Sequence, residues 1–249
     1  MRIVWALIFF ASVLTSCNTE TKKKNKSVPK KVKIVKKKTV LTNENAVDFL
    51  TKYGKEHPET IIEISTNYGD MQVKLYEDTP LHRANFLYLI NEKYYNGTFF
   101  HRVVKGFMIQ AGNTDNWGTS GKRAKIGTYK LPAEIKANRF HKKGALAASR
   151  SYVDNPDKLT FPFEFYIVQG HTFDKQTMDM VEEQYKKKIS TEQRKEYYRI
   201  GGTPHLDGEH TVFGEVIEGF DTIDKIASVQ TDKGEWPEIN VVIQMRIIK

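Results

Sequence analysis

The side chains that could do nucleophilic, acid–base or metal chemistry are few, and their spacing matches no common catalytic pattern. The 249-residue chain has one cysteine, Cys17. Its seven histidines are His57, His82, His101, His141, His171, His205 and His210. No two histidines have HxxxH or HExxH spacing, and neither a GxxxxGK[ST] phosphate loop nor a GxSxG nucleophile motif is present. Metal-dependent, nucleotide-binding and serine-hydrolase functions are therefore poorly supported.

One arginine, Arg102, stands out because it lies in the largely apolar segment Phe99–Gln110. Side chains along a strand alternate between its two faces. We therefore expect Arg102 to share a face with Phe100 and Val104, and His101 to point the other way.

An arginine among apolar residues must be paired or functional, because burial of an unpaired charge is costly. A structural ion pair, for example with Glu134 or Glu164, is the simpler interpretation of Arg102 taken alone. A catalytic or binding role is the alternative, and the residue types do not decide between them.

Turn residues and apolar periodicity indicate the elements that would position these side chains. Asn43 has the character of a helix N-cap, which predicts a linker helix over residues 43–57. Asp78-Thr79-Pro80 opens a second helix, with the cap first and proline in the first turn, that runs to about Tyr94. Further helices are expected at 174–200, where Ser190 begins a capping-box pattern, and at 221–229.

Short apolar or aromatic runs separated by glycine and proline predict strands in the rest of the chain. They are expected at 61–65, at 71–76, throughout 98–168, at 210–216 and at 241–248. The fold class is therefore mostly β. We expect a closed antiparallel β-barrel capped by two helices, with a helical insertion at 174–202.

The segment Phe99–Gln110, which reads FFHRVVKGFMIQ, closely resembles the signature of the cyclophilin-type peptidyl-prolyl cis-trans isomerases. Four later segments resemble that family in the same order: Pro132–Glu134, Gly144–Ser149, Phe165–Val168 and Leu206–Gly214. The resemblance covers Ile61 to Ile248, about three quarters of the chain, and leaves 174–202 as an insertion. Residues 58–249 are therefore expected to be a cyclophilin-like domain that acts on X-Pro bonds without a cofactor or metal. The alternative is a binding module for Pro-containing segments with little turnover.

The resemblance also implies a role for each matching residue. Arg102 corresponds to the catalytic arginine, Gln110 orients it or binds the peptide backbone, and His210 lies at the pocket rim. The substrate-binding residues would be Phe107, Met108, Tyr166 and Leu206 around proline, Ser149 and Arg150 beside the preceding residue, and His101 and Glu164 next to the site.

Three positions depart from the family pattern. Arg150 replaces the usual asparagine, and Glu164 the usual glutamine, so Glu164 could neutralise Arg150 or pair with Arg102 and reduce catalysis. His205 stands where cyclosporin-sensitive members carry tryptophan, so we expect weak binding of that drug. Sub-micromolar inhibition in an activity assay would contradict this expectation.

The net charge of +9 belongs to the N-terminal region. Residues 18–40 contain ten lysines and one acid, Glu20, whereas from Leu41 onward 28 basic and 29 acidic residues give a net charge of −1. A nucleic-acid-binding face needs positive charge on the folded domain. We therefore expect no nucleic-acid partner, and we expect a monomer.

The first residues resemble a bacterial lipoprotein signal. A positive start and the apolar run Ile3–Leu14 precede Leu14-Thr15-Ser16-Cys17, an aliphatic residue and two small ones before cysteine. This pattern implies that residues 1–16 are a cleaved signal peptide, that Cys17 is acylated, and that residues 17–42 are a lysine-rich disordered tether. We expect a lipid-anchored protein of a bacterial cell envelope, facing the periplasm or the exterior, with Pro-containing polypeptides and membrane lipid as partners. A cleaved signal with an incidental cysteine is the alternative.

Overall fold

The computed structural model describes residues 39–113 and 117–249, which belong to one compact unit that begins at Thr39. The predicted signal peptide, the Cys17 lipidation site and the tether up to residue 38 lie outside the described residues. Leu41 was assigned to the tether, but its side chain is fully buried and its N–H donates to the Ile126 carbonyl at 2.7 Å.

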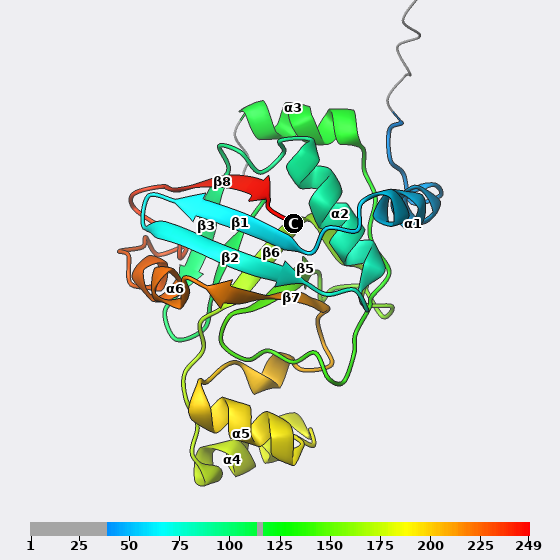
Figure 1. Ribbon diagram of the computed structural model, residues 1–249. Coiled ribbons are helices and arrows are strands. Elements are labelled where there is room, and N and C mark those ends of the chain that lie inside the picture. The colour runs from blue at the N-terminus through cyan, green and yellow to red at the C-terminus, as the bar shows by residue number, and fades with distance from the viewer. Residues whose placement is uncertain (1–38, 114–116) are drawn as a thin grey trace, which may run out of the picture. The chain divides into compact units, whose positions relative to one another are not determined.

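Within the described residues, eight strands close into an antiparallel barrel in the order β1-β2-β7-β5-β6-β4-β3-β8 (Figure 1). The strands are β1 (Ile61–Thr66), β2 (Gly69–Leu75), β3 (Phe99–Val104), β4 (Met108–Ala111), β5 (Ala145–Arg150), β6 (Thr160–Val168), β7 (Val212–Glu218) and β8 (Val241–Ile247). The predicted hairpin is confirmed, because β1 pairs with β2 from Ile61 opposite Lys74 to Thr66 opposite Gly69. The predicted barrel is therefore the observed fold.

Two helices, α2 (Pro80–Asn91) and α6 (Phe220–Ala227), lie on opposite sides of the barrel, as predicted (Figure 1). Pro80 occupies the first turn of α2, where its missing N–H costs nothing. The barrel interior is a continuous apolar core to which both helices contribute buried side chains, including Phe86 and Ile223.

The first helix, α1 (Ala46–Glu56), begins later than predicted and packs on α2. Asn45, not Asn43, is its N-cap residue, and the Asn43 Oδ1 instead accepts from the Lys130 N–H at 2.9 Å. Leu50 is fully buried and belongs to the same apolar cluster as the barrel core. The helix is thus part of the domain rather than a linker.

A third helix, α3 (Trp117–Ile126), lies within the region that was predicted to be entirely β, and that prediction was wrong. Its Gly118 and Gly121 lower helix propensity and favour a loop assignment. Gly127 follows the helix with φ +132°, and a Cβ there would lie 2.0 Å from the Leu41 carbonyl oxygen.

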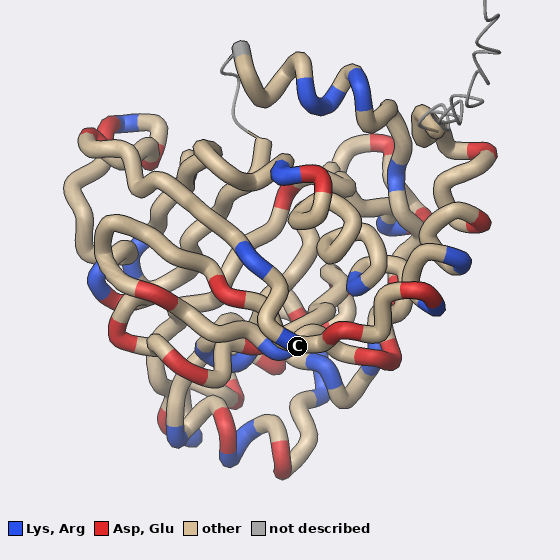
Figure 2. Tube along the Cα trace, turned by 45° about the horizontal axis from the view of Figure 1, so that its top comes forward, with Lys and Arg blue, Asp and Glu red and all other residues tan. Residues whose placement is uncertain are grey.

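The predicted helical insertion is confirmed as α4 (Lys175–Tyr185) and α5 (Thr191–Arg199), followed by the short 3-10 helix η1 (Pro204–Leu206). Both helices have capping boxes, and the Ser190 Oγ accepts from the Gln193 N–H at 3.2 Å. The two signs of charge are interspersed along the described trace (Figure 2). In this part of the chain no helix is both long and apolar enough to cross a bilayer.

Candidate active site

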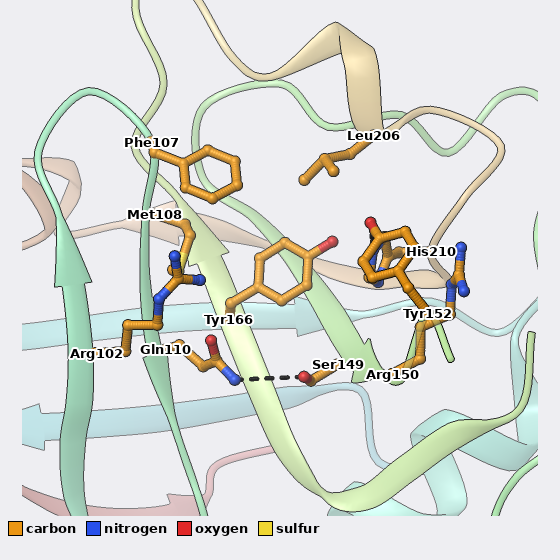
Figure 3. Close-up of a pocket in the computed structure, with 10 residues that line it drawn as sticks. All are labelled: Arg102, Phe107, Met108, Gln110, Ser149, Arg150, Tyr152, Tyr166, Leu206 and His210. Atoms are coloured by element: carbon orange, nitrogen blue, oxygen red, sulfur yellow. Dashed lines mark hydrogen bonds between the residues drawn. The ribbon is translucent and has the colours of Figure 1, made fainter. Parts of the chain in front are cut away.

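A cavity of about 260 Å³ opens on the outer surface of the barrel, beside β3, β4, β5 and β6 (Figure 3). Its lining residues are Arg102, Phe107, Met108, Gln110, Ser149, Arg150, Tyr152, Tyr166, Leu206 and His210. The structure thus brings together nine of the eleven residues predicted for the site, leaves out His101 and Glu164, and adds Tyr152.

A β-bulge in β3 directs Arg102 to the outside of the barrel. Phe100 pairs with Ala111 and Arg102 pairs with Gln110, and the register shifts between these two pairs. Phe100 is fully buried in the barrel core, whereas Arg102 lines the outer cavity. The prediction that Phe100 and Arg102 share a face was therefore wrong, because a bulge interrupts strand alternation.

Glu235 holds the guanidinium group of Arg102, whose Nε donates to Glu235 Oε2 at 2.5 Å. Glu235 lies in the loop before β8 with φ +65°, and its carbonyl oxygen accepts from the Val103 N–H at 2.8 Å. Figure 3 shows the rest of the guanidinium beside Met108 and facing the Tyr166 ring. Because Nε is the anchored atom, the two terminal nitrogens lie toward the cavity.

Neither acid suggested by the sequence is the partner of Arg102. Glu134 accepts from the N–H groups of Leu81 and His82 at 3.0 and 2.9 Å and contacts His82 Nδ1 at 2.6 Å. Glu164 accepts from Gln110 Nε2 at 3.2 Å and from Asn113 Nδ2 at 2.7 Å. Glu235 is 133 positions from Arg102, and no feature of the sequence indicated the contact.

The cavity has an apolar floor that is separate from the barrel core. Met108, Tyr166 and Leu206 belong to a buried cluster on the outer face, against which Phe107 packs. The four residues predicted to hold a prolyl ring therefore meet, as expected. Such a surface desolvates a ring without any hydrogen bond to it.

The hydroxyl of Tyr166 begins a buried chain of hydrogen bonds. It donates to His141 Nε2 at 3.0 Å, and His141 Nδ1 donates to Asp207 Oδ1 at 2.9 Å. The other oxygen of Asp207 accepts from the hydroxyl of Tyr197, on α5 of the insertion, at 2.7 Å. The polar atom of Tyr166 is thus satisfied, and the ring can line an apolar pocket at no cost.

Arg150 has a full set of partners of its own. It donates from Nε to the Glu209 carbonyl oxygen at 2.7 Å, from a terminal nitrogen to Glu209 Oε2 at 2.9 Å, and from the other to the Ser151 carbonyl oxygen at 3.0 Å. Its guanidinium also lies 4.2 Å from the centre of the Tyr152 ring. The Glu164 carboxylate therefore pairs with neither Arg150 nor Arg102, and both possibilities raised by the sequence were wrong.

Gln110 and Ser149 line the cavity and are hydrogen-bonded to each other. Gln110 Nε2 donates to Ser149 Oγ at 3.3 Å in addition to its bond to Glu164. Gln110 also lies directly opposite Arg102 in the β3–β4 pair. His101, by contrast, packs on Trp236 at 5.9 Å between ring centres and does not line the cavity.

His210 forms the rim of the cavity together with Tyr152. Burial lowers the pKa of His210 to about 4, and nearby His141 and Arg150 act in the same direction. The neutral ring donates from Nδ1 to the Ala148 carbonyl oxygen at 3.1 Å and accepts at Nε2 from the Tyr152 hydroxyl at 2.7 Å. Tyr152 lies in the loop after β5, beyond the matching motif, so no sequence signal identified it.

Across residues 39–113 and 117–249, no group of three or more His, Cys, Asp or Glu side chains is arranged to hold a metal ion. The site offers an anchored arginine, Arg102, beside an apolar cavity, with a second arginine, Arg150, held by Glu209 and neutral polar groups at the edge. This arrangement suits non-covalent stabilisation of a bound group.

Barrel and site together define a cyclophilin, and comparison with known proteins agrees. Residues 61–246 match the family described as cyclophilin type peptidyl-prolyl cis-trans isomerase/CLD. The chain therefore belongs to the cyclophilin-type peptidyl-prolyl cis-trans isomerase family.

Two relatives from bacteria show how the chain compares with other members of the family. A Staphylococcus haemolyticus protein, provisionally named a peptidyl-prolyl cis-trans isomerase, is 33% identical over 188 residues, covering 75% of this chain and 89% of that protein. A Streptococcus pyogenes protein, provisionally named a bifunctional phosphatase/peptidyl-prolyl cis-trans isomerase, is 33% identical over 193 residues. The match covers 76% of this chain and only 39% of the streptococcal protein.

The fold is also that of a crystal structure of a Cryptosporidium parvum cyclophilin type peptidyl-prolyl cis-trans isomerase. The TM-score is 0.55 at 24% identity, covering 77% of this chain and 98% of that one. The same parasite protein has been solved in the presence of the dipeptide Ala-Pro.

Proposed function

We propose that this chain catalyses cis/trans isomerisation of X-Pro bonds in exported polypeptides. The observation that carries the proposal is the position of Arg102, whose Nε is fixed by Glu235 while its terminal nitrogens face the apolar cavity formed by Met108, Tyr166 and their neighbours. Family membership supports it, as does the structure of the Cryptosporidium protein in the presence of the dipeptide Ala-Pro.

The chemistry requires only that the C–N bond lose its double-bond character. The barrier to rotation is about 18–20 kcal/mol, and uncatalysed X-Pro exchange takes tens of seconds or longer. In the twisted state the prolyl nitrogen recovers its lone pair and becomes a hydrogen-bond acceptor. A guanidinium N–H of Arg102 that donates to this nitrogen stabilises the twisted state more than either planar state, and this difference is what lowers the barrier.

The other residues would hold the two sides of the bond. The apolar floor would fix the prolyl ring, and the backbone of Ser149 and Arg150 would hold the residue before it. Since Arg150 pairs with Glu209 and Glu164 accepts from two amides, Glu164 does not pair with Arg102. His210 stays neutral at pH 7 because its pKa is about 4, so it adds no second positive charge beside Arg102.

The direct test is cis/trans exchange of an Ala-Pro peptide, followed by NMR for the wild type, Arg102→Lys and Arg102→Ala. The wild type should accelerate exchange, and Arg102→Ala should lower kcat/KM by about 100-fold, the usual cost of losing one transition-state donor. Arg102→Lys should also be impaired. Lysine has a single side-chain nitrogen, so it cannot bond to Glu235 through one nitrogen and donate to the substrate from another. Peptide binding without faster exchange would instead identify a binding module. Full activity of Arg102→Ala would refute the role given to the arginine.

We also propose that the protein is anchored through acylated Cys17 to a bacterial membrane, on the side where exported chains fold. The support is the sequence Leu14-Thr15-Ser16-Cys17 after a short apolar run. Several acyl chains on one residue exceed the two signals that stable anchoring requires. Cys17→Ser should abolish labelling by a radioactive fatty acid, and a high-salt wash, which screens the attraction of the lysines to anionic lipid, should then release the protein from the membrane fraction. Retention of the label would contradict acylation at Cys17.

A further inference from the structure

The helical insertion comes close to the cavity at the C-terminal end of α4. There α4 (Figure 1) packs against η1, which carries His205 and the cavity-lining residue Leu206. Leu206 is part of the cavity wall, so η1 lies between the insertion and the site.

Three aromatic rings form a continuous row across this junction. Phe107 of the cavity stacks on His205 with ring centres 5.6 Å apart and planes 26° apart. His205 in turn faces Tyr185, the last residue of α4, at 5.3 Å and 30°. Tyr185 remains 42% exposed, so part of its ring is available to a ligand.

The insertion holds this row in place through hydrogen bonds to the segment that carries His205. Lys187 Nζ donates to the His205 carbonyl oxygen at 2.8 Å and also to the Asp207 carbonyl oxygen. The Tyr197 hydroxyl fixes the Asp207 side chain at 2.7 Å. The rings are therefore positioned before any ligand arrives, which reduces the entropy lost on binding.

The three rings of this row present an uncharged aromatic surface. Burial, with smaller contributions from His141 and Lys187, lowers the pKa of His205 below its ordinary value. Its ring is therefore neutral at pH 7 and can pack against another aromatic group. Offset and tilted aromatic contacts favour aromatic side chains over aliphatic ones of similar size.

We propose that Phe107, His205 and Tyr185 form an aromatic subsite for the side chains of the two residues that follow proline. This inference rests on the proposed function. Ser149 and Arg150, which would hold the residue before proline, lie across the cavity from Phe107 (Figure 3). The chain after proline therefore leaves the cavity past Phe107, and each further residue of extended chain adds about 3.3–3.6 Å of reach toward Tyr185. The insertion thereby makes the enzyme select Pro-aromatic sequences.

The test uses three peptides, Ala-Ala-Pro-Ala-Ala, Ala-Ala-Pro-Phe-Phe and Phe-Ala-Pro-Ala-Ala. Both kcat/KM and affinity are measured by NMR for the wild type, Tyr185→Ala, Tyr185→Phe and Tyr198→Ala. Tyr198 is the matched control, because it is 36% exposed and lies on α5 of the same insertion. The wild type should prefer Pro-Phe-Phe over Pro-Ala-Ala by about 5- to 10-fold, the range of one or two aromatic contacts.

Tyr185→Ala should bring that preference close to one, whereas Tyr185→Phe and Tyr198→Ala should retain it. The subsite is refuted if the wild type does not distinguish the peptides, if Phe before proline has the same effect, or if the preference survives in Tyr185→Ala. The affinity ratio tests the subsite even if no peptide is isomerised. Absence of any acceleration would refute only the isomerase function.

Discussion

At the scale of single residues, each charge beside the cavity has its own partner. Arg102 pairs with Glu235, Arg150 with Glu209, and Glu164 accepts from two amides. These separate contacts keep the two arginines from sharing one acid. The cavity is therefore lined by two separately paired arginines, Arg102 and Arg150, and its other lining residues are apolar or neutral.

Glu235 is expected to be a positioning residue, because it touches Arg102 and not the cavity. Glu235→Gln removes the charge that holds Nε and should lower kcat about tenfold with little change in KM, since a misplaced catalytic group costs rate more than binding. The measurement is peptide exchange by NMR at several substrate concentrations. Glu238→Gln, a change to an exposed acid in the same loop, is the control and should match the wild type. A faster Glu235→Gln enzyme would show that Glu235 restrains the arginine instead of positioning it.

His210 should make the folded state sensitive to acid. Its folded-state pKa of about 4 lies below the ordinary value of 6.5. Between these two pH values the unfolded chain binds a proton that the folded chain excludes, so stability rises with pH across this window and is lost as pH falls. By pH 4 the exclusion of this proton lowers the free energy of unfolding by about 3 kcal/mol.

Urea unfolding at pH 4 to 7 checks this expectation, with His210→Gln as the comparison. The variant should lose less stability than the wild type between pH 6.5 and pH 4, because the neighbours of His210, which include His141, Glu209 and Tyr152, are common to both proteins. Parallel curves for the two proteins would show that His210 does not contribute.

At the scale of elements, regular patterns were predictable and local irregularities were not. Capping at Pro80 and at Ser190 indicated α2 and α5 correctly, because caps act within a few residues. The bulge at Arg102 depends on pairing with a neighbouring strand, and the contact with Glu235 depends on a loop that is distant in the sequence. Neither can be predicted from the residues around Arg102. The nine predicted residues that line the cavity came from motif resemblance, and Tyr152 was missed because it follows the motif.

The contribution of α1 to the domain can be measured at Leu50. Removing a buried leucine side chain costs about 2–5 kcal/mol, so Leu50→Ala should lower the free energy of unfolding by that amount. Val47, on the same helix, is 37% exposed, and Val47→Ala should change stability by less than about 0.5 kcal/mol. Urea denaturation of the full chain separates the two outcomes. Equal midpoints for Leu50→Ala and the wild type would mean that α1 is only a linker.

At the scale of the whole molecule, the closed barrel presents two apolar clusters with different tasks. The interior core, to which α1, α2 and α6 contribute, stabilises the fold, whereas the outer cluster around Tyr166 forms the cavity. Sequence order predicted this architecture because five motif segments recur in the family's order. The path of the insertion to the cavity could not be predicted, because it depends on tertiary contacts of Tyr185 and Lys187.

The charge distribution of the whole chain leads to a prediction about membranes. Residues 18–40 carry a net charge of +9, and the chain from Leu41 onward carries −1. Each lysine near an anionic bilayer contributes about 1 kcal/mol of attraction. Salt screens this attraction, with a Debye length of about 8 Å at physiological ionic strength. The tail should therefore hold the protein to anionic membranes even without a lipid anchor.

Flotation of the Cys17→Ser protein with phosphatidylserine vesicles tests this, because the substitution removes acylation and leaves the charge. The protein should float with anionic vesicles at low salt, sediment with neutral vesicles, and detach as salt is raised. Replacing the ten lysines of residues 18–40 by glutamine should abolish flotation and leave peptide isomerisation unchanged, since these lysines precede the described domain. Equal flotation of both proteins would make the tail a solubilising spacer, and the whole of membrane attachment would then depend on Cys17.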